Sequence, residues 1–218
     1  CCLLVGHWMQ GDFGQDRKNV GYTIKSFLEH FKTKQNPPAL ILKCHTATTS
    51  IMDREKVLDK IDSIRKTVKG SRIPNIYLMH GEISDEQINE LYNHPKVKVM
   101  VSHTKGEGFG RPLLEFTTTG KPIIASGWSG HTDFLDPELS TLIGGTLTNV
   151  HPSAAVKDLI LPESSWFTPN DSDVSKAYKE TFKRYKNKIV DAKKLKRRTL
   201  QNFTYDHMVV ELENILKK

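Results

Sequence analysis

The sequence is poor in cysteine and contains no long hydrophobic run. Its three cysteines, Cys1, Cys2 and Cys44, are odd in number and lack the spacing of metal ligands, which argues against a disulfide framework and a zinc site. No stretch approaches the ~20 apolar residues of a membrane span. The 14 glycines and 10 prolines are scattered and form no repeat, which excludes a collagen-like or largely disordered chain. We therefore expect a globular protein in a reducing, cytoplasmic setting, with peripheral attachment to a membrane as an alternative.

The length of 218 residues suffices for one large domain with a sizeable core. The chain begins with Cys-Cys-Leu-Leu-Val-Gly, which is typical of a strand that starts without a lead-in, an initiator methionine or a signal peptide. We expect from this beginning that the chain is a fragment of a longer protein with sequence missing upstream.

The net charge of +7 is concentrated in one segment. Residues 176–198 hold eleven lysines and arginines against two acidic residues, and the rest of the chain is slightly acidic. Apolar residues recur in this segment at helical spacing, which predicts one amphipathic helix with its lysines on the outer faces: Tyr178, Phe182, Tyr185, Ile189, Ala192 and Leu195. Such a face is either solvated or in contact with anionic lipid or nucleic acid.

Short apolar runs alternate with longer amphipathic ones up to residue 126. The runs predict strands over 3–6, 39–44, 75–79, 97–102 and 121–126, and helices over 20–31, 53–68, from Ser84 onward and over 112–119. Strands separated by helices favour an α/β fold, a Rossmann-like doubly wound parallel sheet. Periodicity weakens over 142–169, which we interpret as an irregular excursion, and a short helix is expected over 206–216.

Ligands of such sheets bind beyond the carboxyl ends of the strands, so the loops after each strand are the candidates. The densest signal follows the predicted strand ending at Ser102: Lys-Gly-Glu107-Gly-Phe-Gly-Arg-Pro-Leu-Leu-Glu115. Free amides in a glycine-rich turn before a helix suit a phosphate. Two carboxylates beside an anion site suit hydroxyl groups, one set on a sugar and one on a ribose. Each feature alone has a structural explanation, a tight turn or a solvated glutamate.

At this point the sequence resembles a known family. Glu107-Gly-Phe-Gly-x-Pro-x-x-Glu115, followed by Gly120-x-Pro-Ile-Ile-Ala-Ser, is similar to the nucleotide-sugar-binding signature of retaining GT-B glycosyltransferases of family 4, relatives of glycogen synthase and sucrose synthase. The resemblance covers the C-terminal, donor-binding half of that fold. It implies a Rossmann-like domain over residues 1–200 and a closing helix over 201–218 that packs back toward a missing N-terminal domain.

The resemblance also implies roles for individual residues. Glu107 would contact the donor sugar, Glu115 the ribose hydroxyls, and Lys18 with Arg17 the diphosphate as the sugar departs. The remaining binding residues are the backbone of the glycine-rich turn, the backbone under the base, the first strand end, and a lysine that either joins the phosphate site or extends toward solvent: Gly108, Phe109, Gly110, Ile83, Gly6 and Lys43.

Two positions depart from the family pattern. His7 follows Gly6, where an arginine is expected shortly after the glycine, and Arg111 replaces an aliphatic residue, as either a phosphate ligand or a surface substitution. His131 either lines the sugar pocket or has a structural role, and His7, His45, His80 and His103 are interpreted as isolated histidines.

The sequence thus predicts a retaining hexosyl- or pentosyltransferase that uses a nucleoside-diphosphate sugar, with UDP as the favoured nucleotide. Neither a cofactor nor a metal is expected, because no histidine cluster has ligand spacing. The acceptor is a glycan, a lipid-linked molecule or DNA, and the isolated fragment is expected to be inactive. Two alternatives stay open, a glycosyltransferase that modifies a DNA pyrimidine of phage type and a non-catalytic sugar-nucleotide-binding or scaffold module.

Overall fold

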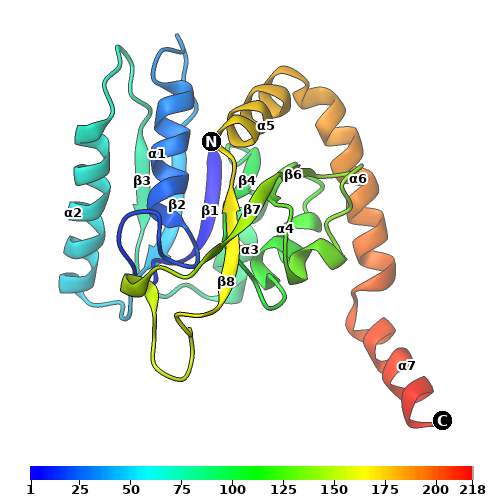
Figure 1. Ribbon diagram of the computed structural model, residues 1–218. Helices are drawn as coiled ribbons and strands as arrows, with labels where there is room; N and C mark the ends of the chain where they lie inside the picture. Colours follow the sequence, from blue (N-terminus) through cyan, green and yellow to red (C-terminus); the bar gives the residue numbers. More distant parts are fainter. Residues whose placement is uncertain (218) are drawn as a thin grey trace.

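The computed structural model describes residues 1–217 as an α/β fold built on one parallel sheet (Figure 1). Its strand order is β3-β2-β1-β4-β5-β6. The strands are β1 Cys2–His7, β2 Leu40–His45, β3 Ile76–Met79, β4 Val99–Ser102, β5 Ile123–Ser126 and β6 Thr141–Ile143. The order reverses between β1 and β4, which places a crevice at their carboxyl ends. The predicted Rossmann-like doubly wound parallel sheet is therefore confirmed.

Helices cover both faces of this sheet. They are α1 Val20–Phe31, α2 Ile51–Thr67, α3 Asp85–Asn93, α4 Arg111–Thr117, α5 Asp171–Lys183, α6 Tyr185–Asn202 and α7 Tyr205–Leu216. One buried cluster joins α1, α2 and α5 to the sheet, and a second joins α3, α4 and α6 to the other face. Both faces of the sheet are thus covered by helices, which is why the sequence of β1 is a continuous apolar run and does not alternate between apolar and polar residues.

Local sequence explains where these helices begin. Ser84 caps α3 in a capping box: its hydroxyl accepts from the amide of Gln87, and the Gln87 side chain accepts from the amide of Ser84. Pro112 stands in the first turn of α4, where a missing amide costs nothing. Helix α1 has the predicted bounds, and the other helices and strands expected before residue 126 lie within a few residues of their predicted bounds.

The expectation of an irregular excursion over 142–169 is wrong. This part of the chain holds β6 and an antiparallel hairpin of β7 Gly145–Asn149 and β8 Ser165–Pro169. The hairpin is mostly exposed along β7, so its residues carry no strong hydrophobic alternation. Its long connecting segment extends beyond the carboxyl edge of the sheet (Figure 1) and contains one turn of 3-10 helix, Pro152–Ala154.

The prediction of a single basic helix over 176–198 is also wrong, because the helix is interrupted at Arg184. Arg184 has φ −109° and ψ 31° and separates α5 from α6. The predicted apolar stripe is nevertheless used: Tyr178 packs on the α1 side of the sheet and Leu195 on the α4 side. The break lets one basic segment cover both faces.

Helix α7 forms as predicted but stands apart from the sheet (Figure 1). None of its described residues is buried, and Met208, Leu212 and Ile215 are exposed. Residue 218, the last of the expected closing segment 201–218, lies outside the described residues. None of the helices described over 1–217 carries an apolar stretch long enough to cross a bilayer.

Candidate functional site

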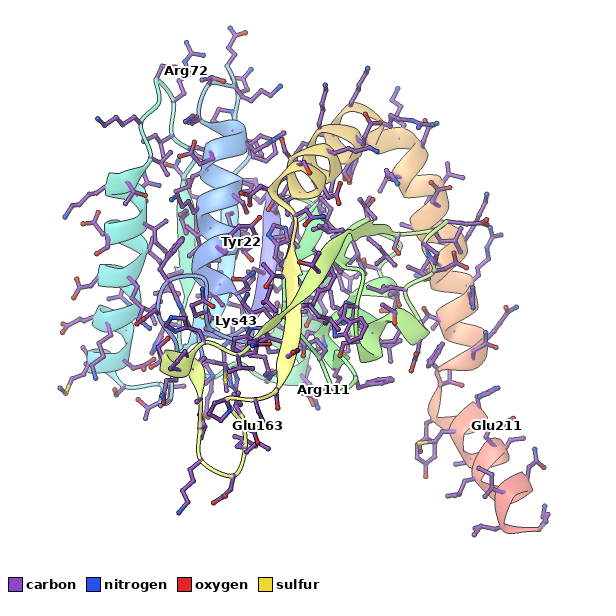
Figure 2. All side chains as sticks on the ribbon, viewed as in Figure 1. Tyr22, Lys43, Arg72, Arg111, Glu163 and Glu211 are labelled. Carbon is purple, nitrogen blue, oxygen red and sulfur yellow. The ribbon has the colours of Figure 1, made fainter. Side chains whose placement is uncertain are left out.

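A cleft of about 570 Å³ opens at the carboxyl ends of β1, β2 and β3. It is lined by residues that follow these strands and by the start of α4: Gly6, His7, Arg17, Lys18, Lys43, His45, Ile83, Arg111 and Glu115 among others. Lys43 and Arg111 lie toward this end of the molecule in Figure 2. The cleft therefore gathers six of the ten predicted site residues, and Glu107 and Gly110 line a small adjoining recess that shares Lys18 with it.

The centre of the recess is an ion pair between Lys18 and Glu107. The Lys18 Nζ atom lies 2.6 Å from Glu107 Oε1 and 2.7 Å from Oε2. Arg17 reaches the same carboxylate at 3.4 Å and donates to the carbonyl of Gly106 at 2.6 Å. The Glu107 side chain is only 8% exposed, so the paired cations are needed to keep its charge buried. The two predicted catalytic groups, which lie far apart in the sequence, are in direct contact.

The loop before α1 is fixed against the segment between β4 and Glu107. The amide of Lys105 donates to the carbonyl of Arg17 at 2.8 Å, and the Asn19 side-chain amide donates to the carbonyl of His103 at 3.0 Å. Asn19 itself has φ 54°, a left-handed conformation that asparagine tolerates well. Asp16 accepts from the amide of Val20 and caps the helix. Lys18 thus sits on an anchored turn between two buried elements.

The glycine-rich turn after Glu107 is held from below by the segment after β5. Ser129 Oγ donates to the Glu107 carbonyl and accepts from the Glu107 amide, and the Gly130 amide donates to the same carbonyl. Gly110 has φ 88° and ends the turn at α4. Among residues 1–217 no acceptor is found for the amides of Gly108, Phe109 or Gly110. These amides are the groups expected to meet a phosphate.

Glu115 faces the cleft from the other side, on α4. It accepts from the Tyr92 hydroxyl at 3.3 Å and pairs with Arg111 Nε at 3.2 Å. Burial of Tyr92 and the neighbouring Glu115 together raise the pKa of this phenol well above its usual value, so it remains a hydrogen-bond donor. Sequence reasoning missed Tyr92. Arg111, left open between two roles, lines the cleft and orients Glu115, while its side chain is 81% exposed.

Lys43 and Ile83 occupy the wall formed by β2 and the segment after β3. Lys43 Nζ donates to the carbonyl of Gly81 at 2.5 Å, and burial lowers the pKa of its ammonium group. Lys43 therefore lines the cleft rather than extending into solvent. Ile83 lies beside it in the lining, as predicted for the wall under a base.

The histidines are not isolated, which corrects the sequence interpretation. His7 and His45 end β1 and β2 as register partners, and their rings lie 4.2 Å apart. His80 follows β3 and bonds Asp53 at 2.8 Å. His103 and His131 are instead fully buried. The Nε2 atom of His131 lies 2.6 Å from the Ser126 carbonyl, which supports its structural role.

An Asp-x-Asp pattern exists at Asp171-Ser172-Asp173, in the first turn of α5, and sequence reasoning overlooked it. Asp171 accepts from the Tyr22 hydroxyl at 2.5 Å, and Asp173 accepts from the Asn170 amide group. Neither aspartate lines the cleft. Within residues 1–217 no group of three or more His, Cys, Asp or Glu side chains is arranged to share a metal ion.

Comparison with known proteins shows a likeness to glycosyltransferases over part of the sequence and in the fold. The family model of glycosyl transferases group 1 matches residues 61–161, which include β4, the glycine-rich turn, α4 and β5. No curated protein sequence matches the chain. The structure is similar to the C-terminal domain of a glycosyl transferase group 1 family protein from Francisella tularensis, at 12% identity and TM-score 0.61, covering 94% of this chain and 86% of that one.

Longer proteins contain the same fold. Sucrose-phosphate synthase from Thermosynechococcus elongatus aligns at 15% identity and TM-score 0.63 over 99% of this chain, and Anabaena HepE, in complex with UDP and glucose, at 13% and 0.62 over 98%. The chain spans 44% and 48% of those proteins. Likeness at this identity establishes the fold, which is that of the C-terminal domain of a GT-B glycosyltransferase. The resemblance found in the sequence is confirmed at this level.

Proposed function

We propose that this chain is the donor-binding domain of a retaining glycosyltransferase that moves a sugar from a nucleoside-diphosphate sugar, UDP-linked, to an acceptor hydroxyl. The observation that carries the proposal is the placement of Lys18, Arg17 and Lys43 in the lining of a single cleft together with Glu115, while Glu107 contacts Lys18 in the adjoining recess. Cations match the diphosphate, and carboxylates match the hydroxyl groups at its two ends. HepE, a structural neighbour in complex with UDP and glucose, is a chemical parallel.

In the proposed reaction each of these residues has a part in the transfer. As the bond between the anomeric carbon and the phosphate breaks, negative charge grows on the departing diphosphate. Lys18 and Arg17 are positioned to stabilise that charge, and one such fixed donor is worth about 2 to 4 kcal/mol of transition-state stabilisation. Glu107, held by Lys18, would orient the sugar. The departing phosphate accepts the proton of the acceptor hydroxyl, so no protein base is required.

Glu115 would bind the ribose hydroxyls, and the wall at Ile83 would contact the base through its backbone. The amides of Gly108, Phe109 and Gly110 would meet the distal phosphate. The acceptor site would belong to a second domain, and closure of that domain over the donor would exclude water.

Calorimetric titration of this chain with UDP, GDP and ADP tests the proposal. We expect UDP to bind and the variants Lys18→Ala and Glu115→Ala to weaken binding by about 10-fold or more, the loss of one charge-assisted contact. Lys98→Ala is a matched control, because this exposed lysine does not line the cleft. The proposal fails if none of the three nucleotides binds.

Transfer itself is measured with the complete protein that carries this domain. Loss of transfer in Glu107→Ala and Lys18→Ala by orders of magnitude is expected of an enzyme, whereas a non-catalytic binding module would bind UDP and show no transfer to lose. Steep salt dependence of duplex binding would instead favour a DNA acceptor.

A further inference from the structure

Three neighbouring strands of the sheet end in histidine at the wall of the cleft. His7 ends β1, His45 ends β2 and His80 directly follows β3. Because parallel strands end at one edge, the three imidazoles form a row: the His7 and His45 rings lie 4.2 Å apart, and His45 and His80 lie 6.4 Å apart edge to face. His7 and His45 both line the cleft.

The outer end of this row is fixed. His80 is bonded to Asp53 at 2.8 Å, and Asp53 also accepts from the Thr46 amide at 3.0 Å. Burial raises the pKa of the Asp53 carboxyl, but the hydrogen bonds from His80 and Thr46 outweigh this and hold it well below its usual range. His80 is therefore committed to a structural contact and leaves His7 and His45 as the free pair.

The inner pair has unused hydrogen-bonding capacity. The Nδ1 atom of His45 is buried and has no hydrogen-bond partner among residues 1–217, and the neighbouring His7 is exposed in the lining of the cleft. Two imidazoles at this separation cannot both be imidazolium cations without strong repulsion. The pair is suited to take up one additional proton.

The charged groups around the pair determine whether it takes up that proton. Burial lowers the pKa of His7, and the neighbouring His45, Lys18, Lys43 and Arg17 lower it further. The charged and titratable groups of the same wall and cleft come from every element around the pair: Arg17, Lys18, Lys43, Asp53, His80, Glu82, Asp85, Arg111 and Glu115. A diphosphate among these cations would reverse the local field and favour an imidazolium.

The geometry points to the His7–His45 pair as a proton-binding part of the diphosphate site, which takes up one proton when the nucleotide diphosphate binds and thereby adds one more cation to the cleft. This inference rests on the proposed function, because it needs a diphosphate in this cleft. It gives His7 the role of a cation that is present only when the anion is bound.

The test is UDP titration of the full chain by calorimetry, between about pH 6 and pH 8 and in two buffers of different ionisation enthalpy. We expect uptake of close to one proton near pH 7 and binding about 3- to 10-fold tighter at pH 6.5 than at pH 8, since one linked proton changes affinity up to tenfold per pH unit. The terminal phosphate of UDP titrates near pH 6 itself, so each result is compared with a variant that shares this contribution.

The variants are His7→Gln and His45→Gln, with His94→Gln as the matched control, because His94 is exposed and lies outside the cleft. Both cleft variants should lose the proton uptake and flatten the pH dependence, and His94→Gln should behave as the unaltered chain. If His45→Gln does not fold, two measurements remain. One is the titration of His7→Gln. The other is the Hε1 proton resonance of His7 in the unaltered chain, which should move to its protonated position on addition of UDP.

The outcomes separate the two proposals. Unchanged proton uptake in His7→Gln, with UDP still bound, would overturn the role of the pair and leave the donor site standing. Absence of UDP binding at every pH would overturn the proposed function, and this inference with it.

Discussion

Lys18 Nζ contacts both carboxylate oxygens of Glu107, at 2.6 and 2.7 Å. The two residues come from different halves of the sheet, one from the loop after β1 and one from the loop after β4, so their contact spans the point where strand order reverses. Through this pair the group proposed to stabilise the departing phosphate also positions the group proposed to hold the sugar. The two functions are therefore coupled in one buried contact.

This coupling predicts how the pair responds to substitution. Lys18→Met and Glu107→Gln should each lower the transfer rate of the complete protein by about 10²- to 10³-fold, because each removes a group fixed beside the reacting centre. In urea unfolding of this chain, a double-mutant cycle should show a coupling of about 1 to 3 kcal/mol, since either single change leaves a buried charge less well paired. Additive stability effects would show that the contact contributes nothing to folding. Lys66→Met, on an exposed helix face, is the control.

The conformation of the glycine-rich turn predicts a difference between two of its glycines. Gly110 has φ 88°, and an added Cβ would lie 2.9 Å from the Cβ atom of His131, whereas a Cβ at Gly108 would meet nothing within 4 Å. Gly110→Ala should therefore lower the free energy of unfolding by about 1 to 3 kcal/mol and Gly108→Ala by less than about 0.5 kcal/mol. Urea unfolding of both variants measures this. Equal effects would mean that the turn relaxes freely.

Asp16 predicts a pH-dependent stability. Burial raises the pKa of this carboxyl to about 6, against the opposing effects of the Val20 amide and Lys60. A raised carboxyl pKa means that the folded state binds the proton more tightly than the unfolded state, so this contribution to stability is present below about pH 4 and is lost as the pH rises through 6. Asp16→Asn keeps an acceptor for the Val20 amide and removes the buried charge.

We therefore expect Asp16→Asn to stabilise the chain by about 1 to 3 kcal/mol at pH 7.5 and to have little effect at pH 4, measured by urea unfolding. Asp62→Asn, which breaks only the exposed pair with Lys66, should cost less than about 0.5 kcal/mol at pH 7.5. Destabilisation by Asp16→Asn at pH 7.5 would contradict the expectation and indicate that the charge itself supports the turn that carries Lys18.

The parallel sheet could be predicted because each of its elements has a strong local signal. Strands such as β1 and β4 are buried on both faces and read as short apolar runs, while α1 carries a full apolar stripe. The β7–β8 hairpin had no such signal. Gly145 permits its close pairing, because a Cβ there would lie 2.3 Å from the Thr168 carbonyl oxygen, but in the sequence the pair Gly144-Gly145 is typical of a loop.

The residues of the candidate site likewise fall into those that local sequence patterns mark and those that they do not. Glu107, Glu115 and the cations after β1 could be found because chain-local patterns and strand ends mark them. The contacts of Tyr92 with Glu115 and of His7 with His45 depend on tertiary packing and on strand register. The histidine row does have a signal in the sequence, because parallel strands end at one edge of a sheet and β1 and β2 both end in histidine.

Glu115 gives the sharpest prediction about the nucleotide. Its carboxylate is 40% exposed, faces the cleft, and is oriented from two sides by the Tyr92 hydroxyl and by Arg111. If it binds ribose hydroxyls, the unaltered chain should prefer UDP to 2′-deoxy-UDP by about 10- to 100-fold, the contribution of one hydrogen bond to a charged group. Glu115→Ala should weaken binding of UDP and abolish this preference.

Tyr92→Phe separates orientation from direct contact. It removes only the donor at 3.3 Å, so it should reduce the preference for UDP over 2′-deoxy-UDP without abolishing it, because Arg111 still holds the carboxylate. Calorimetry with both nucleotides on each variant measures the two effects on one scale. A preference that survives in Glu115→Ala would move the ribose site elsewhere in the cleft. A preference lost in Tyr92→Phe as fully as in Glu115→Ala would make the phenol the group that fixes the carboxylate, since burial and Glu115 keep it protonated.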